Sequence, residues 1–461
     1  MGVGASGGLD SAMDPAHLSE RGQGIRILTI APDLQAGGLQ RVARNFALGY
    51  RRFGVESAYF GYRGGGSFAQ QLIDGGVAVF TGASDDIEQR AALKRALDWR
   101  PDVVHIHRNG FGDARLSAML VAAKASSRRG TAAPVGIVET NVFGRVDYSA
   151  DRGCIDIHYL ISRWCLWKWQ RWSEILSPRP IGIVMPNLVM HAEFSRRSSD
   201  GREAFREAQR IPADALVFGR VGSLLEPKWS PIIFDAFSAY AAAHERAWLL
   251  LVGMPAALRP ALTAVPEGVR RRVVLVDFMS DDRALIDVYA SMDVFLHAAR
   301  IGESFGMVLA EALLCGVPVI TLSTPDKDNS QLEIVGHESG GLVVANVAGM
   351  IEAMRRLEDP ELRRRYADQG ASEIVKRFSA ETLIPSAIDI AQLVSEGLPP
   401  VQLHRRLLAR PQLCTSVSTE ETAALLRGRI GEHSFKTLAL MKLVSNPYLY
   451  RAYRLATGKP I

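Results

Sequence analysis

The sequence predicts an α/β protein with two doubly wound, largely parallel sheets that face a central cleft. Its 461 residues are too many for one hydrophobic core, so two domains are expected. From residue 25 onward, short β-rich apolar runs alternate with helical patterns, which is typical of a parallel sheet covered by helices. The alternation starts afresh at residue 215 and predicts a second Rossmann-like domain. A composition of 48% hydrophobic and 22% charged residues is that of an ordinary globular protein.

The first domain is expected to occupy residues 25–185. Residues 1–24 precede it and are rich in Gly and Ser, which predicts a disordered N-terminus. Helices are expected over residues 39–53 and 86–99. The expected strands are the apolar runs I-R-I-L-T-I-A, V-E-S-A-Y-F, V-A-V-F, P-D-V-V-H-I-H, P-V-G-I-V-E-T, I-D-I-H-Y-L-I-S and P-I-G-I-V-M-P.

The second domain is expected over residues 186–397, after a polar linker that includes A-E-F-S-R-R-S-S-D-G-R. We expect its last helix to cross back to the first domain. Because ligands bind outside the carboxyl ends of strands in open α/β sheets, two facing sheets predict one deep cleft between the domains. The expected strands are A-L-V-F-G-R-V-G-S, A-W-L-L-L-V-G, R-V-V-L-V-D-F, D-V-F-L-H-A, V-P-V-I-T and G-G-L-V-V.

Residues 398–461 are expected to form a basic helical extension. They hold ten Lys and Arg against three Glu, a net +7, which leaves about −2 of the total +5 for residues 1–397. The body is therefore not basic, and nucleic acid is not expected as a partner. The last part, L-A-L-M-K-L-V-S-N-P-Y-L-Y-R-A-Y-R-L-A, contains no acidic residue. Two readings stay open: residues 401–461 lie on an anionic membrane surface, or they pack on the body as ordinary helices.

Neither a membrane span nor a metal centre is expected. No run of about 18 uncharged apolar residues is present. The four cysteines include no C-x-x-C pair, so neither a disulfide framework nor a zinc site is indicated and a reducing cytoplasm fits. His105 and His107 alternate at the end of an expected strand, but without further nearby ligands a structural or substrate-facing role is favoured over metal binding.

The most informative segment is R-I-G-E-S-F-G-M-V-L-A-E-A-L-L-C-G-V-P-V-I, residues 300–320. Glu303 and Glu311 are eight residues apart, and if the segment between them is helical their carboxylates are separated by roughly 12 Å. Free backbone N–H groups at the helix start would lie near the first of them. This layout suits a ligand with hydroxyls at both ends and a diphosphate between, and a nucleotide-sugar is such a ligand.

The same segment resembles the E-x7-E signature of the retaining glycosyltransferases of family 4, which have the GT-B fold, and the resemblance covers roughly residues 25–395. It implies that the first domain faces the acceptor and the second binds the nucleotide-sugar. It also implies that Glu303 contacts the donor sugar near the reacting carbon and that Glu311 accepts the ribose hydroxyls. The backbone of Ser304, Phe305 and Gly306 would face the diphosphate or the sugar.

The resemblance extends to V-G-S-L-L-E-P-K-W-S, residues 221–230, where the family pattern has Arg and Lys neutralising the diphosphate. Lys228 matches the lysine, whereas Ser223 stands where the arginine is expected. Losing that cation would cost several kcal/mol of transition-state stabilisation. Arg220 lies three residues upstream, an odd offset that predicts the opposite face of the strand. Arg300 and Lys327 are other candidate substitutes.

Two loops of the first domain are also expected near the donor. Gly37 and Gly38 follow the first strand, and such glycines let a phosphate or a sugar approach the backbone at a helix start. Gln40 and Arg41 follow them and are expected to face the cleft. Asn141 stands where many relatives have a histidine that approaches the donor sugar. It can hydrogen-bond a hydroxyl but cannot carry a proton, and a turn-forming role is an equal reading.

Three further features are given structural readings. Asn187 is expected to be structural at the hinge, and Glu333 is expected to orient a helix rather than to react. Four tryptophans fall between residues 164 and 172, where helical spacing favours packing over a sugar platform. They are Trp164, Trp167, Trp169 and Trp172.

We therefore interpret the chain as a cytoplasmic glycosyltransferase that moves a hexosyl unit from a nucleotide-diphosphate sugar to a hydroxyl of a glycan or lipid-linked acceptor. Retention is implied by the resemblance. Neither a metal nor a cofactor is expected. One alternative is a catalytically impaired relative that binds nucleotide-sugar or glycan, because Ser223 and Asn141 depart from the pattern. Another is a GT-B phosphorylase or epimerase.

Overall fold

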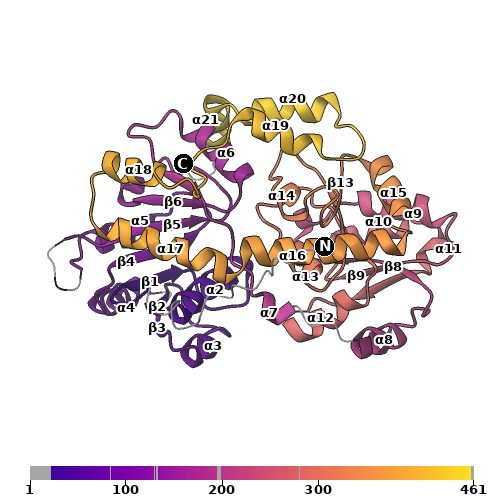
Figure 1. The fold of residues 1–461 in the computed structure, drawn as a ribbon, viewed down its shortest axis with the longest axis horizontal. Helices are drawn as coiled ribbons and strands as arrows, with labels where there is room; N and C mark the ends of the chain where they lie inside the picture. Colours follow the sequence, from indigo (N-terminus) through magenta and orange to yellow (C-terminus); the bar gives the residue numbers. More distant parts are fainter. Residues whose placement is uncertain are drawn as a thin grey trace, which may run out of the picture.

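Two parallel β-sheets, one in each half of the chain, organise the computed structural model (Figure 1). The structure describes residues 22–83, 85–128, 130, 133–194, 199–279 and 281–457. Most of the predicted N-terminal disorder, residues 1–21, lies outside these ranges, and residues 22–24 form a turn.

The first sheet has seven strands in the order β3-β2-β1-β4-β5-β6-β7, and all its pairs are parallel. Helices cover the inner strands on both faces, as the fully buried run V-V-H-I-H-R of β4 illustrates, whereas the edge strand β3 is partly exposed. The strands are β1 (Arg26–Ala31), β2 (Glu56–Gly61), β3 (Ala78–Thr81), β4 (Val103–Arg108), β5 (Gly136–Asn141), β6 (Ile157–Leu160) and β7 (Gly182–Val184). The helices are α2 (Gly38–Arg52), α3 (Ala69–Asp74), α4 (Asp86–Asp98), α5 (Ala114–Lys124) and α6 (Arg163–Ser173).

The second sheet has six parallel strands in the order β10-β9-β8-β11-β12-β13. Its strands are β8 (Leu216–Val221), β9 (Ala247–Val252), β10 (Val273–Val276), β11 (Val294–His297), β12 (Val319–Leu322) and β13 (Gly341–Val344). Its helices are α7 (His191–Phe194), α8 (Ser199–Ala208), α9 (Ile232–Ala241), α10 (Arg259–Thr263), α11 (Glu267–Arg270), α12 (Asp282–Ala290), α13 (Met307–Leu314), α14 (Gln331–Val335), α15 (Val347–Arg356) and α16 (Pro360–Phe378).

These two sheets confirm the predicted fold class, two Rossmann-like domains of the GT-B type with a helical C-terminus. In each sheet the strand order reverses at the first strand of its half, between β1 and β4 and between β8 and β11. Such switch points are where doubly wound sheets bind ligands, outside the carboxyl ends of the strands. The loops after β1, β8 and β11 are therefore the ones to inspect for a site.

A pair of long helices connects the two domains. Helix α16 packs on α13 and β13 of the second domain, and α17 (Ala380–Ser395) packs on α2, β4 and β5 of the first. Figure 1 shows the two helices running one after the other across both sheets. The inward face of α17, which includes Ile384 and Ile388, shares a buried core cluster with β1 and α2.

The C-terminal extension lies over both domains on one side of the molecule (Figure 1). It consists of α18 (Pro400–Leu408), α19 (Thr419–Arg427), α20 (Phe435–Val444) and α21 (Pro447–Ala456). Tyr450 of α21 stacks on Trp172 of α6 at a ring-centroid distance of 3.8 Å, and the buried Arg454 donates to the carbonyl of Val146. No helix within the described residues is long and apolar enough to cross a bilayer.

Candidate functional site

A cleft of about 310 Å³ opens between the two domains, within the range usual for small-molecule sites. Its walls come from the start of α2, from the ends of β5, β6 and β8, and from the loop that leads into α13. The lining residues are Gly38, Leu39, Val42, Val142, Phe143, Ile161, Asn187, Arg220, Gly222, Ser223, Lys228, Glu303, Ser304, Phe305, Gly306, Met307 and Val308.

A buried carboxylate and a lysine meet in this cleft. Lys228 Nζ lies 2.7 Å from Glu303 Oε2, and His297 Nε2 lies 3.3 Å from Glu303 Oε1. Burial alone would raise the pKa of Glu303, but Lys228 and His297 lower it to about 2. Glu303 is therefore ionised at neutral pH and holds the lysine ammonium at the cleft wall. The two residues are 75 positions apart in the chain, so only the fold brings them together.

The segment from Glu303 to Glu311 is not one continuous helix, so the condition for the separation of roughly 12 Å is not met. Helix α13 begins at Met307, and Gly306 precedes it in the left-handed conformation with φ 97°. Gly302 also has a positive φ of 68°, and an added Cβ there would lie 1.7 Å from the carbonyl oxygen of Asp328. A continuous helix cannot pass through a residue with the left-handed backbone of Gly306. The turn formed by Ser304, Phe305 and Gly306 therefore precedes the helix and lines the cleft.

Glu311 lies on α13 with both carboxylate oxygens occupied. Arg41 Nη1 of the first domain lies 3.1 Å from its Oε1, and the Tyr289 hydroxyl donates to its Oε2 at 2.9 Å. Burial and the nearby Glu311 raise the pKa of Tyr289 well above its ordinary value. A ribose that binds Glu311 as the resemblance implies must therefore displace Arg41 or share the carboxylate with it.

Arg220 is oriented differently from the prediction. The odd offset from Ser223 predicted opposite faces, but both residues line the cleft. The reason is that β8 ends at Val221, so the two-residue period of a strand does not extend to the loop that carries Ser223. Arg220 is buried and its guanidinium donates to the carbonyl of Lys228 at 2.8 Å.

Several other candidates lie outside the residues that line the cleft. The Asn141 side chain bonds the backbone N–H and C=O of Arg145, which favours the turn-forming reading. Arg300 is exposed and pairs with Glu226, and Lys327 pairs with the neighbouring Asp326. Of the two glycines, Gly38 lines the cleft, whereas Gly37 is the extended residue before α2.

The structure agrees with the structural readings of Glu333 and of the four tryptophans, whereas Asn187 lines the cleft. Both carboxylate oxygens of Glu333 accept backbone N–H groups at the start of α6, from Arg163 at 3.1 Å and Trp164 at 2.8 Å. Glu333 thus caps a helix of the opposite domain, which is the helix-orienting role expected. All four tryptophans of α6 are buried in one core cluster. His105 bonds the Tyr50 and Thr140 hydroxyls within the first domain. Among the described residues, no group of three or more His, Cys, Asp or Glu side chains could hold a metal.

Sequence reasoning missed His297 and Tyr289. His297 lies at the carboxyl end of β11, where its ring is held between the Thr321 hydroxyl at 3.0 Å and Glu303. A polar residue at the end of a buried strand, in D-V-F-L-H-A, was the available signal. Tyr289 lies on the buried face of α12, and its sequence neighbours give no sign of its partner.

Acid is expected to destabilise the protein through His297. Burial, together with the charge of Arg220, lowers the pKa of His297 to about 4. The unfolded chain therefore binds more protons than the folded one between about pH 4 and 6.5, and stability falls as the pH falls through that window. From pH 7.5 to 5.5 we expect this residue to contribute a loss of about 1 kcal/mol.

Urea unfolding at several pH values measures this contribution. In His297→Gln the slope of unfolding free energy against pH should be shallower than in the wild type, and in the control His404→Gln, an exposed residue, it should be unchanged. An identical slope in His297→Gln would contradict the expectation.

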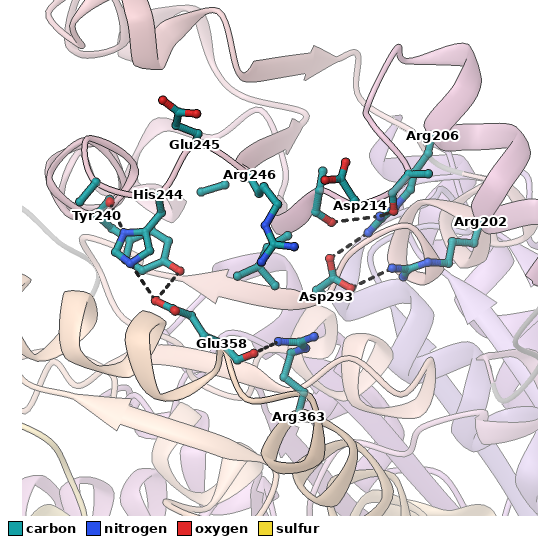
Figure 2. Close-up of a pocket in the computed structure, with 15 residues that line it drawn as sticks. Arg202, Arg206, Asp214, Tyr240, His244, Glu245, Arg246, Asp293, Glu358 and Arg363 are labelled. Carbon is teal, nitrogen blue, oxygen red and sulfur yellow. Dashed lines mark hydrogen bonds and ion pairs between the residues drawn. The ribbon is translucent and has the colours of Figure 1, made fainter.

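A second hollow lies at the opposite, amino-terminal ends of β8 and β9 (Figure 2). Its charged side chains face one another. Arg202 and Arg206 pair with the two oxygens of Asp293 at 2.8 and 2.9 Å, and His244 lies 3.0 Å from Glu358. Because these carboxylates are engaged by neighbouring cations and lie far from the strand ends where such sheets bind ligands, we read this hollow as structural.

The part of the second domain that carries most of the cleft residues resembles a known protein family. Residues 215–359 match the family described as glycosyl transferases group 1. This match covers about a third of the chain and lies in the second of the two facing Rossmann-like domains. Lys228, Glu303 and Glu311 all lie within the matched residues.

Similar proteins extend the comparison beyond this domain. D-inositol 3-phosphate glycosyltransferase 2 of Catenulispora acidiphila is 30% identical over 247 residues, which are 50% of this chain and 55% of that protein. The chain thus spans about half the length of this curated relative. HepE of Anabaena, solved in complex with UDP and glucose, is 16% identical with a TM-score of 0.59, and the alignment covers 80% of this chain and 99% of HepE. WaaG, a glycosyltransferase involved in lipopolysaccharide biosynthesis, is 16% identical with a TM-score of 0.51, over 79% of this chain and 99% of WaaG.

Proposed function

We propose that this protein transfers a hexosyl unit from a nucleotide-diphosphate sugar to a hydroxyl of a glycan or lipid-linked acceptor, with retention of the anomeric configuration. The observation that carries the proposal is the ion pair between Lys228 and the buried Glu303 in the interdomain cleft, within residues that match the group 1 glycosyltransferases. The similar proteins, which include HepE in complex with UDP and glucose and a glycosyltransferase involved in lipopolysaccharide biosynthesis, support a donor of this kind and an acceptor of the cell envelope.

Three charged residues have a part in the proposed reaction: Lys228 and Glu303, which line the cleft, and Glu311 on α13. The bond from the anomeric carbon to the diphosphate breaks, a bond to the acceptor oxygen forms on the same face, and the acceptor proton passes to the departing diphosphate. Lys228 stabilises the charge that develops on the leaving group, helped by the backbone amides at the start of α13. Glu303 orients the donor sugar and holds Lys228 in place. Glu311 accepts the ribose hydroxyls. The negative charge is neutralised by side chains in this scheme, so chelating metal with EDTA should leave the rate unchanged.

A panel of nucleotide-sugars tests the proposal. Purified protein is incubated with UDP-, GDP-, ADP- and TDP-hexoses, and release of the nucleoside diphosphate is measured with and without acceptor alcohols. Turnover of one donor with retention supports the proposal, and the absence of both transfer and hydrolysis for every donor contradicts it.

A non-catalytic role is the second candidate, favoured by Ser223 in the cleft wall where the resemblance expects a cation, and by the turn-forming Asn141. Binding of a nucleotide-sugar by calorimetry without turnover would identify this case. Orthophosphate-dependent product release would instead indicate a phosphorylase, and interconversion of free nucleotide-sugars would indicate an epimerase.

We also propose that the C-terminal extension associates with an anionic membrane surface, which would place the enzyme peripherally at the inner face of the cytoplasmic membrane. Helix α21 packs on the body through Tyr450 and Arg454, while its other face and most of α20 are exposed. No acidic residue follows Glu432 in the sequence. The exposed apolar side chains, which include Phe435 at 88% and Tyr448 at 70%, are accompanied by exposed basic ones, and this combination favours anionic lipid. They are Phe435, Leu438, Leu443, Tyr448, Leu449, Tyr453 and Leu455, with Lys436, Lys442 and Arg451.

Vesicle flotation checks this proposal. We expect the wild type to bind phosphatidylcholine vesicles that contain 30% phosphatidylglycerol at least about tenfold more tightly than pure phosphatidylcholine. The variant Phe435→Ser/Lys436→Gln/Tyr448→Ser should lose most of this binding, and Ile87→Ser, an equally exposed apolar residue on α4, should keep it. Equal flotation of the triple variant and the wild type would contradict the proposal.

A further inference from the structure

Arg220 is a buried cation whose hydrogen bonds are incomplete. Its side chain leaves the end of β8 and is 1% exposed, with the guanidinium over the rings of Trp229 at 5.2 Å and Phe295 at 5.8 Å. Nη2 donates to the carbonyl of Lys228. Nε and Nη1 are buried and have no hydrogen-bond partner within the part of the chain that the structure describes. Unpaired buried donors carry a desolvation penalty, which a ligand that accepts from them removes.

Arg220 keeps its charge at neutral pH. Burial lowers the pKa of the guanidinium to about 10, and the nearby Glu303 and Tyr289 oppose that shift. The structure gives no ion pair for Arg220 among the described residues, since the Glu303 oxygens are taken by Lys228 and His297. The cleft wall therefore contains a cation, Arg220, with two N–H groups, Nε and Nη1, that are available to a ligand.

The position of Arg220 defines the kind of ligand. It lines the cleft beside Lys228 and Ser223, where one ammonium and one planar guanidinium converge on the same space. Guanidinium groups match phosphate oxygens through two parallel N–H donors, and an adjacent ammonium adds a point charge.

We propose that Arg220 binds the diphosphate of the donor and acts as the second cation beside Lys228. The inference rests on the proposed function. In this arrangement the guanidinium reaches the diphosphate from strand β8. The arginine that the resemblance expects in the following loop is then not needed, and Ser223 can occupy that position. Because Arg220 also holds the Lys228 carbonyl, its removal has a structural consequence that the test must separate from a lost phosphate contact.

Calorimetry with UDP, GDP, ADP and TDP first identifies the diphosphate that the wild type binds. Arg220→Met is then compared with the wild type for that diphosphate and, by competition, for the matching nucleoside. We expect about 10- to 100-fold weaker binding of the diphosphate and less than threefold change for the nucleoside. Arg246→Met, an exposed arginine of the hollow in Figure 2, is the control and should bind both as the wild type does.

A second-site variant sharpens the result. In Arg220→Met/Ser223→Arg, a guanidinium returns to the cleft from the neighbouring position, and at least tenfold of the lost diphosphate affinity should return. If Arg220→Met does not fold, Arg220→Lys is measured instead, and it should weaken the diphosphate severalfold while the nucleoside is unaffected.

The possible failures are distinct. Wild-type protein that binds none of the diphosphates contradicts the proposed function. Wild-type binding that Arg220→Met, or Arg220→Lys in its place, leaves unchanged overturns the role of Arg220 alone. Equal weakening of diphosphate binding and nucleoside binding also overturns it. That pattern is explained by a shift of the turn that carries Lys228, whose carbonyl Arg220 holds, and not by a lost phosphate contact.

Discussion

Substitution of Glu303 by glutamine is expected to lower the rate of sugar transfer by roughly 100-fold or more. The amide keeps the size of the side chain but removes the charge that holds Lys228 at 2.7 Å. The lysine is then free to move, and the donor sugar loses a strong acceptor at the reacting carbon. Because both losses act during the reaction, the effect should fall on kcat rather than on KM.

Steady-state kinetics with the donor found in the panel provide the measurement. Glu226→Gln is the matched control, since Glu226 is exposed, precedes Lys228 in the same turn and pairs with Arg300. It should keep the wild-type kcat within about threefold, as expected for an exposed ion pair. Lys228→Met should lose a comparable rate, and the double variant should lose less than the product of the two single effects, because the pair acts as a unit. A Glu303→Gln enzyme with more than a third of wild-type kcat would exclude the assigned role.

Substitution of Asp328 by asparagine is expected to cost about 3–5 kcal/mol of unfolding free energy. Asp328 follows β12 in the second domain and accepts from Arg145 at 3.0 and 3.1 Å and from Lys168 at 2.7 Å, both in the first domain. Burial opposes its ionisation, but the two cations hold the pKa of Asp328 far below its ordinary value. Its neutralisation leaves the buried Lys168 and the partly buried Arg145 without their carboxylate.

Urea unfolding of Asp328→Asn against Asp326→Asn isolates this interaction. Asp326 pairs with the exposed Lys327 at 2.8 Å, so its loss should cost less than about 1 kcal/mol. Adding Lys168→Met to Asp328→Asn removes one of the stranded cations and should recover part of the lost stability. Equal unfolding midpoints for Asp328→Asn and the wild type would show that the domains do not depend on this cluster.

Much of the fold was predictable because its elements are locally encoded. The apolar runs of β1 and β8 are short and bounded by turn residues, and the strands and helices alternate as the βαβ pattern requires. The same rule predicted one deep cleft between the two sheets, and Lys228 and Glu303 line a cleft there. Helix α13 begins at Met307 and not at Glu303, because Gly306 precedes its first turn in a left-handed backbone conformation.

The partners of the candidate residues were less predictable. Asn141 and Arg300 looked equivalent to cleft residues in the sequence, yet each is engaged by a neighbour that the motif does not contain. Arg220 was assigned to the wrong face because side chains alternate between the two faces only within a strand, and β8 ends at Val221, before Ser223. His297 was missed because one polar residue in an apolar strand gives no indication of its neighbours in space.

The sequence by itself determined the two parallel sheets, their order along the chain and the segment that carries Glu303 and Glu311, since hydrophobic periodicity and turn residues act over a few positions. Only the tertiary structure decided that Glu303 holds Lys228, that Arg41 occupies Glu311 and that Arg220 faces the cleft. These contacts join residues 75 and 270 positions apart or depend on where a strand ends. The physical reason is that ion pairing and burial depend on distance in space, and a local pattern carries no information about that distance.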